Sequence, residues 1–555
     1  MATVQQATTS NGMPVLILKE GSSQNKGKEA QKNNIMAAKL IAEMVRSSLG
    51  PRGMDKMLVD TLGDVTVTND GATILKEIDV QHPAAKMMVE ISKSVDNEVG
   101  DGTTSGVIFA GALIELAEEL INKDVHPTII VDGYRKGAAK AIEVMGKIAQ
   151  KVDPKDKSWL IKVAKTSMQT KLISSEANEL SNIVVSAVLQ VAVQVDKDFR
   201  VDIDDIKVEK KPGGSVRDTA LIKGIVLDKE VTHGGMPKRV EKAKIALLNA
   251  PLEIEKTEFD AKISISSPDK MKMFLDEENK LLKTMVDQIA QSGANVVICQ
   301  KGIDDIAQHY LARAGILTVR RVRESDIVKL VKATKGTAIT NLEDLTADDL
   351  GTADLVEERK VETDKWVFVE GCKEPKALTI LIRGGSQRVV DEVNRSLHDA
   401  LMVVKDVMEK PAIVPGGGAP EAYAAARLAE WANTLSGREQ LAAQKFAEAL
   451  ETIPLILAEN AGMDPIDTTT ELRSKQSKGQ KWTGIDVRNG KIVNMVKGDI
   501  VEPLAVKEQI IKSATEAASM ILRIDHVIAT AGSKVPPGGG PSGMGGMGGH
   551  GGHGH

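Results

Sequence analysis

The spacing of apolar residues changes twice along this chain of 555 residues, and this change restricts the possible folds more than any single motif does. Up to about residue 150 and again after residue 384, apolar side chains lie three and four positions apart, which is typical of amphipathic helices. Between residues 244 and 382, short apolar runs alternate with helical ones, which is typical of βα units on a mostly parallel sheet. At roughly 100–200 residues per domain, the chain is long enough for about three or four domains.

Long helices are expected in the first part of the chain. In "NNIMAAKLIAEMVRSSLG" the apolar side chains share one helical face: Ile35, Ala38, Ile41, Met44, Val45 and Leu49. Gly50-Pro51 should end this helix, because Gly and Pro commonly follow a last turn. Further helices are expected over residues 83–99, 103–123 and 127–152.

Strands and later helices are expected at several places. Val65 and Val67 alternate in a short strand that the turn Asn69-Asp70-Gly71 closes. Two helices follow residue 155, and then a Pro-Gly-Gly turn at residues 212–214 separates two strand-like runs. The sequence after residue 384 predicts a long helix over 386–410, further helices through residue 460, a hairpin over 482–495 and a last helix over 505–529.

Composition argues against several classes of protein. The net charge is −5, from 72 basic and 77 acidic residues, so the basic footprint of a nucleic-acid-binding protein is missing. Aromatic residues make up only 2%, so aliphatic side chains and Met must fill the core. Cys299 and Cys372 lie far apart and form no Cys-x-x-Cys pair, which predicts reduced thiols in a cytoplasmic protein. We find neither a signal peptide nor a run of about 18 uncharged apolar residues, and so expect no membrane span.

The stretch "NEVGDGTTSGVIF" combines an acid, glycines and three hydroxyl side chains at the expected start of a helix. Backbone N–H groups at a helix start attract phosphate, and Gly100 and Gly102 would let a phosphate come close. Asp101 fits beside a phosphate only with a cation between them, and Mg²⁺ prefers such oxygen ligands. The alternative is plain helix capping, since Asp, Thr and Ser are favoured at helix starts, and the segment alone leaves both open.

Three other glycine turns lie next to expected helices. They are Gly50-Pro51-Arg52-Gly53, Asp70-Gly71 and Gly416-Gly417-Gly418. Each alone predicts only a structural turn, but the four together, two of them with an acid, favour a phosphate site. The chain has neither the G-x-x-x-x-G-K-[ST] motif nor a G-x-G-x-x-G after a strand, so a nucleotide would be bound by a different fold.

The segments "LGPRGMDKML", "TNDGATIL", "VGDGTTS" and "VPGGGAPE", in this order, resemble the ATP-site motifs of the group II chaperonins. The resemblance covers essentially the whole chain and is strongest to the archaeal thermosome subunits. It implies a multidomain α/β fold with a mostly helical, discontinuous equatorial ATP domain, a small α/β intermediate domain, and an apical α/β domain with a helical protrusion as a built-in lid. The implied boundaries are 1–153 and 408–535 (equatorial), 154–224 and 376–407 (intermediate), 225–375 (apical, protrusion about 253–283) and a disordered Gly/Met/His tail over 536–555.

The resemblance also implies a role for each matching residue. Asp101 would hold Mg²⁺, while Asp70 and Asp399 would position and activate the water that attacks the γ-phosphate of ATP. The implied nucleotide-binding residues are Leu49, Gly50, Pro51, Gly71, Gly102, Thr103, Thr104, Ser105, Lys171 and Gly417, with Asp486 and Glu502 near the base and ribose. From spacing alone, Asp399 is one more acid on the polar face of a helix, and the alternative for Lys171 is a solvated surface lysine.

The function that the resemblance implies is that of an ATP-dependent chaperone. Identical or paralogous subunits would form a double ring, bind unfolded proteins, and enclose them when ATP and Mg²⁺ drive closure of the lid. Met271, Met273, Phe274 and Leu275 in the protrusion would either contact clients or pack it onto its neighbours. Two alternative functions are a metabolic phosphotransferase with an unusual phosphate site and a scaffold that binds ATP without hydrolysing it. No nucleic-acid or membrane partner is expected, and the expected compartment is the cytoplasm.

Overall fold

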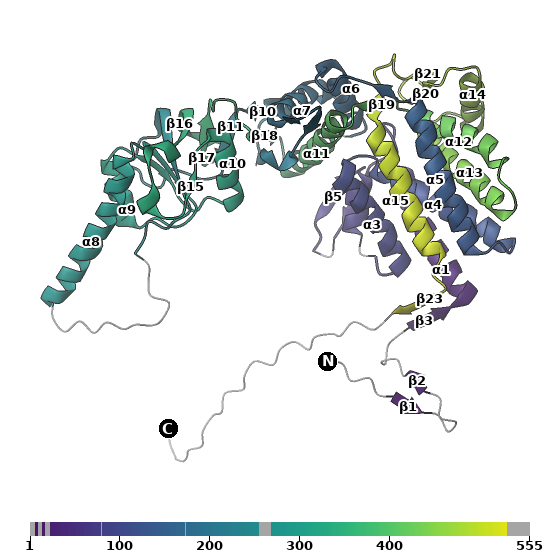
Figure 1. Ribbon diagram of the computed structural model, residues 1–555, viewed down its shortest axis with the longest axis horizontal. Coiled ribbons are helices and arrows are strands. Elements are labelled where there is room, and N and C mark those ends of the chain that lie inside the picture. The colour runs from purple at the N-terminus through teal and green to yellow at the C-terminus, as the bar shows by residue number, and fades with distance from the viewer. Residues whose placement is uncertain are drawn as a thin grey trace, which may run out of the picture.

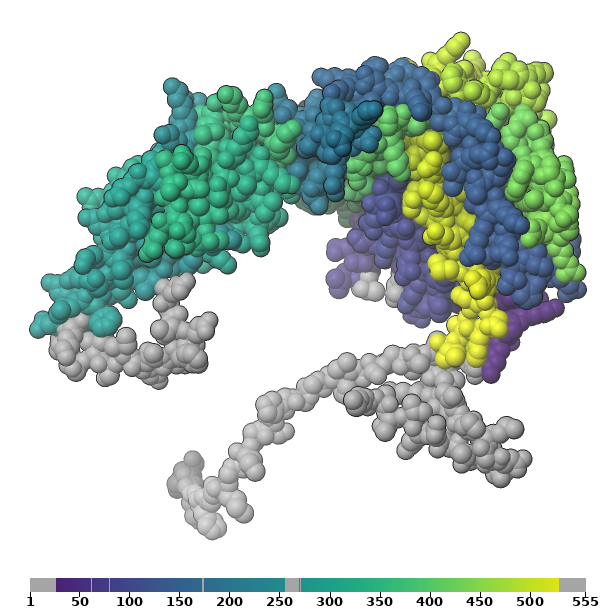
Figure 2. Space-filling model, viewed as in Figure 1, coloured from purple at the N-terminus to yellow at the C-terminus, as the bar shows by residue number. Residues whose placement is uncertain are grey.

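The computed structural model describes residues 6–8, 14–16 and 23–529, apart from 61, 79, 172–173 and 255–267. The expected tail at 536–555 and part of the expected protrusion therefore lie outside the described residues. The chain forms an arch, with a helical bundle at one end, a sheet-containing unit at the other and a smaller unit between them (Figure 1). The space-filling view shows this middle unit bridging the two ends (Figure 2). The predicted class, a multidomain fold of helices and sheets, is confirmed.

The helical bundle takes helices from both ends of the chain. Its members are α1 (Gly27–Arg46), α2 (Gly71–Glu77), α3 (Pro83–Val99), α4 (Thr103–Asn122), α5 (Pro127–Ile148), α12 (Ala419–Ala432), α13 (Arg438–Asn460), α14 (Pro465–Ser477) and α15 (Leu504–Leu522). α4 is buried along most of its length because α1, α13 and α15 all pack against it. Aliphatic side chains fill the core as expected, and Phe446 meets Phe109 and Tyr134 edge to face.

Short strands border the bundle, and most pair antiparallel in twos. The pairs are β1 (Gln6–Thr8) with β2 (Pro14–Leu16), β3 (Ser23–Lys26) with β23 (His526–Ala529), β4 (Lys56–Val59) with β5 (Val65–Thr68), and β20 (Thr483–Asp486) with β21 (Lys491–Asn494). β19 (Ala412–Pro415) lies between β22 (Val501–Pro503) and β6 (Gln150–Lys151). The strand predicted around Val65 and the hairpin predicted over 482–495 are confirmed.

Three local predictions are wrong in detail. Met44 is 43% exposed, because Ile41 and Val45 point to the core and Met44 lies on the flank of that face. The helix predicted over 127–152 ends at Ile148, since the next residues pair with β19. The last helix ends at Leu522, because residues 526–529 pair with β3 near the other end of the chain. Both early helix ends are set by strand partners that are distant in sequence.

The middle unit packs α6 (Lys157–Met168), α7 (Ala177–Val191) and α11 (Gln387–Glu409) around a three-stranded sheet. A small hairpin, β7 (Val193–Val195) with β8 (Asp198–Arg200), follows α7. β18 (Leu378–Gly384) lies between β9 (Ile206–Pro212), which is parallel to it, and β10 (Ala220–Ile222), which is antiparallel. The two runs around the Pro-Gly-Gly turn are therefore strands, as predicted, but they do not pair with each other. The long helix predicted over 386–410 is confirmed as α11.

The third unit contains a seven-stranded sheet in the order β11-β17-β16-β12-β13-β14, with β15 beside β12. Its elements are β11 (Gly224–Leu227), β12 (Arg239–Leu248), α8 (Pro268–Gln291), β13 (Val296–Cys299), α9 (Asp305–Arg313), β14 (Leu317–Val319), α10 (Glu324–Thr334), β15 (Ala338–Ile339), β16 (Gly351–Val361) and β17 (Asp364–Glu370). β12 to β15 pair in parallel, as βα units should. β11, β16 and β17 pair antiparallel, so the prediction of a mostly parallel sheet is wrong for this half. β16 and β17 join through a tight turn at Glu362, and such a hairpin is antiparallel.

Two predictions concern single side chains of this unit. Cys299 and Cys372 are buried and free, and burial raises the pKa of their thiols to about 11 and about 12. On α8 the predicted client-contacting side chains Met271, Met273, Phe274 and Leu275 are between 47% and 71% exposed. Within the described ranges, no helix is both long and apolar enough to cross a membrane.

Candidate nucleotide site

A single cavity collects residues from all four predicted glycine turns or from their immediate neighbours. It lies where the bundle meets the end of α6 and leaves about 1080 Å³ unfilled by protein atoms, part of it open to solvent. Most of the predicted site residues line it: Leu49, Gly50, Pro51, Asp101, Gly102, Thr103, Thr104, Ser105, Lys171, Gly417, Asp486 and Glu502. The other three, Asp70, Gly71 and Asp399, lie directly behind this lining. Segments up to about 450 residues apart in sequence thus form one wall.

The start of α4 is open toward this cavity. Its N-cap residue is Gly102, with a left-handed φ of 79°, and no side chain caps the helix. Asp101 instead accepts a hydrogen bond from the Gly102 backbone N–H, at 2.6 Å. The capping alternative for Asp101, Thr103 and Ser105 is therefore wrong. The first-turn N–H groups are left without side-chain partners from the described residues, which is the arrangement that binds anions.

Asp70 joins the starts of two helices. Its Oδ2 accepts hydrogen bonds from the backbone N–H and the hydroxyl of Thr73, at 2.9 and 2.8 Å, so it caps α2. Its Oδ1 accepts from the Thr103 hydroxyl at 3.4 Å. Gly71 makes this approach possible, because a Cβ there would lie 2.5 Å from Oγ1 of Thr104. Burial raises the pKa of Asp70, but Lys171 and the Thr73 hydrogen bonds outweigh burial and lower the net pKa.

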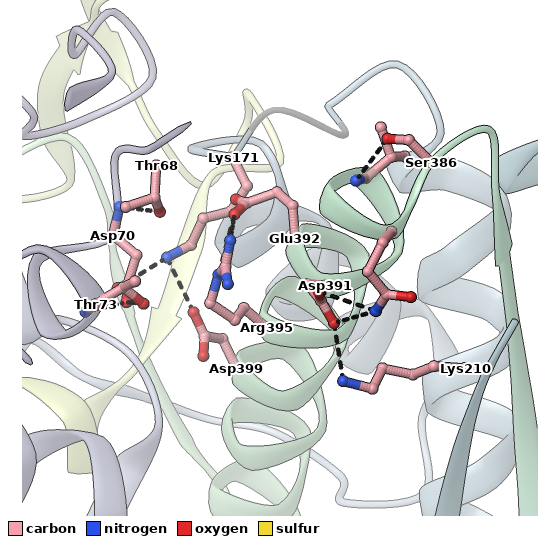
Figure 3. A network of polar contacts seen from close by, with 12 residues as sticks. Thr68, Asp70, Thr73, Lys171, Lys210, Ser386, Asp391, Glu392, Arg395 and Asp399 are labelled. Atoms are coloured by element: carbon pink, nitrogen blue, oxygen red, sulfur yellow. Dashed lines mark hydrogen bonds and ion pairs between the residues drawn. The ribbon is translucent and has the colours of Figure 1, made fainter. Parts of the chain in front are cut away.

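Lys171 lies between acids from two parts of the fold. Its Nζ is 2.9 Å from Oδ2 of Asp399 on α11 and 3.4 Å from Oδ1 of Asp70 in the bundle. Figure 3 shows the lysine reaching between them. The three side chains are 9%, 8% and 12% exposed in the order Lys171, Asp399, Asp70. The two alternatives are therefore wrong: Lys171 is not a solvated surface lysine, and Asp399 is not an exposed acid on a polar helix face.

The charges of these three groups are set by opposing effects. Burial alone would lower the pKa of Lys171, but Asp399 and Asp70 raise it well above its usual value, so the lysine stays charged. Burial raises the pKa of Asp399 well above its usual value, Lys171 opposes this, and Asp70 and Asp101 add to it. Asp399 is thus the group in this cluster that most readily takes up a proton.

A glycine contact sets the position of α11 against the bundle. Gly100, at the end of α3, has a left-handed φ of 69°. A Cβ on Gly100 would lie 2.4 Å from Cβ of Met402 and 3.5 Å from Cα of Asp399. The absence of that Cβ lets α11 cross the α3–α4 turn at contact distance, so Asp399 lies next to Gly100, the residue before Asp101.

The opposite end of the cavity is built on the β20–β21 hairpin. Gly417, with a φ of 65°, accepts a hydrogen bond from the Ile485 N–H at 2.9 Å, and a Cβ on Gly417 would lie 2.6 Å from the Ile485 carbonyl oxygen. The Asp486 carboxylate accepts hydrogen bonds from the backbone N–H of Arg488 and the side-chain amide of Asn489. Asp486 therefore also has a structural role in shaping the hairpin turn.

Some residues at the cavity, among them the lining residues Lys507 and Asn69, were not predicted from the sequence as site residues. Lys507 on α15 has its Nζ 2.9 Å from Oε1 of Glu421 and 2.5 Å from Oε2 of Glu502. Asn69 donates to the Thr170 carbonyl oxygen at 2.7 Å. Glu421 could have been singled out from the sequence, because it follows the triple glycine by three residues. Nothing in the sequence indicates that Lys507 meets both acids.

The oxygen atoms at the phosphate end suit a hard cation. No group of three or more His, Cys, Asp or Glu side chains that could hold a metal occurs among the residues that the structure describes. The Asp101 carboxylate lines the cavity, and the buried Oδ1 of Asn69, also in the lining, has no hydrogen-bond partner there. One carboxylate and an amide oxygen fit Mg²⁺, which typically takes one or two protein ligands together with phosphate oxygens and water.

The chain is similar to known proteins over nearly its whole length. The sequence model of the TCP-1/cpn60 chaperonin family matches residues 41–531. A thermosome subunit alpha of Archaeoglobus fulgidus is 57% identical over 96% of each chain. A thermosome subunit of Methanopyrus kandleri is 55% identical over 94% of this chain and 95% of its own, and a thermosome subunit alpha of Sulfolobus acidocaldarius is 54% identical over 96% and 97%. The resemblance stated from the motifs, with the chaperone function and ATPase class that it implied, is confirmed. The chain belongs to the TCP-1/cpn60 chaperonin family.

Proposed function

We propose that the cavity binds ATP with Mg²⁺, and that hydrolysis of this ATP drives a ring-shaped chamber to close on unfolded proteins. The observation that carries this proposal is the buried contact of Lys171 with Asp70 and Asp399 at the cavity edge. It joins the helical bundle to α11 of the middle unit at the phosphate end. Any anion that enters there changes the balance of charge on which this junction depends.

The phosphate chain would lie against the start of α4. The open N–H groups of its first turn and the hydroxyls of Thr103, Thr104 and Ser105 supply donors. Leu49, Gly50 and Pro51, which line the same cavity, would also approach the phosphates. Asp101 and the unpaired Oδ1 of Asn69 are the lining oxygens that would hold Mg²⁺, and the bound ion would supply positive charge to balance the charge of the phosphates.

Hydrolysis needs a water molecule in line with the γ-phosphate. Asp399 and Asp70 would orient this water, and Asp399 would accept its proton. A carboxyl with a raised pKa is the better proton acceptor, and burial raises the pKa of Asp399 but not the net pKa of Asp70. An entering γ-phosphate is a third anionic partner for Lys171, so nucleotide binding would weaken the lysine contact with Asp399 and leave that carboxylate able to act.

The proposed ATP site also implies a division of the chain into three domains. Residues 1–153 and 408–535 would form the equatorial ATP domain, 154–224 and 376–407 the intermediate domain, and 225–375 the apical domain. A separate apolar core within residues 225–377 supports the apical assignment. Asp399 would then belong to a domain that closes on the nucleotide, so hydrolysis and closure would be coupled.

The client surface would lie on α8 of the apical domain. Met271, Met273 and Phe274 are 50%, 71% and 47% exposed there. Methionine and aromatic side chains adapt to irregular apolar surfaces, such as those that unfolded proteins expose. The relatives are named as subunits, some alpha and some beta, which supports assembly of this chain with identical or paralogous chains. We propose that this assembly is a double ring and that it acts in the cytoplasm.

Phosphate release from ATP tests this proposal. Asp399→Ala should keep ATP binding and lose turnover by about 100-fold or more, the range for a general acid or base. Asp391→Ala is the matched control, because Asp391 is on the same helix but its carboxylate is 34% exposed and pairs with Lys210. Equal turnover in wild type and Asp399→Ala would refute the assignment of Asp399. Absence of ATP binding by the wild type would refute the site.

A further inference from the structure

The last turn of α6 leads directly into the loop that carries Lys171. Gln169 is the C-cap residue of this helix, and Gln169, Thr170 and Lys171 all line the cavity. The last carbonyl groups of a helix have no partners within it, so donors from elsewhere have to satisfy them. Two of these donors are local: the Thr170 hydroxyl donates to the Ser167 carbonyl oxygen at 2.8 Å, and the Lys171 N–H donates to that of Met168 at 3.1 Å.

Two side chains of the bundle satisfy the next two carbonyl groups. Nδ2 of Asn69 donates to the Thr170 carbonyl oxygen at 2.7 Å, and Nη2 of Arg488 donates to the Gln169 carbonyl oxygen at 3.3 Å. Asn69 precedes α2, whereas Arg488 lies in the turn between β20 and β21, so the two side chains come from widely separated parts of the sequence. The bundle therefore holds this loop of the middle unit at two neighbouring carbonyl groups.

The position of Arg488 suits a cap at the end of a helix. A cation is favoured at the C-terminal end of a helix, which carries partial negative charge, and the guanidinium supplies such a charge to α6. Arg488 is itself held through its backbone, because its N–H donates to the Asp486 carboxylate and its carbonyl oxygen accepts from Nη2 of Arg52, both at 3.1 Å. Arg488 therefore joins the turn after α1, the β20–β21 hairpin and the end of α6, three segments that all contribute to the cavity lining.

We propose that Arg488 is a positioning residue that caps the end of α6 and thereby holds the loop with Lys171 in place at the cavity. This inference rests on the proposed ATP site, in which Lys171 meets the γ-phosphate. Lys171 reaches Asp70 and Asp399 from this loop, so its ammonium is placed only while the loop is held. A hairpin at one end of the cavity thus acts on a lysine at the other end.

Amide hydrogen exchange in the nucleotide-free, full-length protein tests the contact directly. Arg488→Met removes the charge and the donors, and because Arg488 is exposed, the variant should keep its fold. Exchange of the amides at residues 169–171 should become about 3- to 10-fold faster, the range for one hydrogen bond. Lys491→Met is the matched control, because Lys491 is an exposed cation on the same hairpin that does not line the cavity. It should change this exchange by less than about twofold.

ATP turnover and ADP binding test the consequence for Lys171. ADP has no γ-phosphate, so a misplaced Lys171 should slow ATP turnover and leave ADP binding almost unchanged. Arg488→Met should lower kcat by about threefold or more and keep the ADP affinity within about twofold of the wild-type value. Arg488→Lys should recover loop protection and kcat, because lysine keeps a cation that can donate to the Gln169 carbonyl oxygen.

The outcomes separate the role of Arg488 from the proposed ATP site. If residues 169–171 exchange alike in Arg488→Met, Lys491→Met and wild type, the positioning role is overturned. It is also overturned if Arg488→Met lowers the ATP and ADP affinities equally, because Arg488 would then contact the nucleotide itself. If wild type neither binds nor hydrolyses ATP, the proposed function fails, whereas faster loop exchange in Arg488→Met alone still supports the cap on α6.

Discussion

Replacing Lys171 with methionine should loosen the contact between the bundle and α11. Lys171 is the cation between Asp70 and Asp399, and all three side chains are at most 12% exposed. Lys171→Met keeps much of the side-chain volume and removes only the charge. Two buried carboxylates then face each other without the cation that now lies between them. Removing one partner of a buried ion pair typically costs about 3–5 kcal/mol.

The same helix offers a matched control. Lys210 has its Nζ 2.8 Å from Oδ1 of Asp391, also on α11, but these side chains are 42% and 34% exposed. Both pairs are drawn in Figure 3. Because exposed ion pairs contribute only about 0–1 kcal/mol, Lys210→Met removes an α11 ion pair of similar distance at little cost. Burial is the variable that differs most between the two substitutions.

Amide hydrogen exchange within α11 and α2 is the suitable measurement, since a chain with several domains rarely unfolds in one step. At one factor of ten per 1.4 kcal/mol, Lys171→Met should speed exchange in these helices by about 100-fold to several thousand-fold. Lys210→Met should change it less than about fivefold. If the two variants exchange alike, burial of the Lys171 cluster does not carry the strength assigned to it.

The effect should also depend on pH, with a definite sign. Burial and the Asp70 charge raise the pKa of Asp399, and in Lys171→Met no lysine opposes them. A carboxyl with a raised folded-state pKa favours the folded contact at low pH and loses that contribution as pH rises through the raised pKa. After correction for intrinsic exchange rates, the variant should therefore differ less from wild type at about pH 5 than at about pH 8.

The remaining predictions concern single groups. Gly417→Ala should weaken ATP binding by about tenfold or more, because φ is 65° and the new Cβ would overlap a hairpin carbonyl oxygen, whereas Gly490→Ala, at φ 61° with nothing within 4 Å, should weaken it far less. Burial raises the pKa of Asp406 to about 7, so the stability that its protonated form contributes is lost as the pH rises from about 4, the usual aspartate pKa, to about 7; Asp406→Asn should flatten the fall in melting temperature over this range. The thiols of Cys299 and Cys372, with pKa values of about 11 and 12, should not react with a thiol reagent near pH 8 until the protein is denatured.

Helix boundaries that depend on local chemistry could be predicted from the sequence. α3 starts at Pro83 and ends before Gly100 because proline suits the first helical position and glycine takes the left-handed conformation after the last. The ends of α5 and α15 could not, since each is set by a strand partner hundreds of residues away. The antiparallel half of the large sheet was missed for a similar reason, because strand pattern alone does not give strand direction.

The candidate site divides in the same way. Glycine turns at helix ends, such as Gly50-Pro51 and Gly416-Gly417-Gly418, carry a local signal, and the cavity contains residues of both. Lys507 carries none, because its neighbours in sequence are ordinary helix residues and its two acids reach it only through tertiary packing. The burial of Asp399 could not be predicted either. The spacing of apolar residues in α11 predicts an amphipathic helix with its acids exposed, whereas other elements cover the side of α11 that carries Asp399.

The composition of the bundle has a consequence for synthesis of the chain. α4 is buried mainly by helices of which two, α13 and α15, come from the last quarter of the sequence. At about 5–20 residues per second, the 400 residues between Asn122 and Leu522 take about 20–80 s to emerge from the ribosome. Throughout that interval the apolar surface of α4 lacks its later partners. A nascent chain of this protein therefore carries, for most of its translation, the kind of exposed apolar surface that holding factors at the ribosome bind.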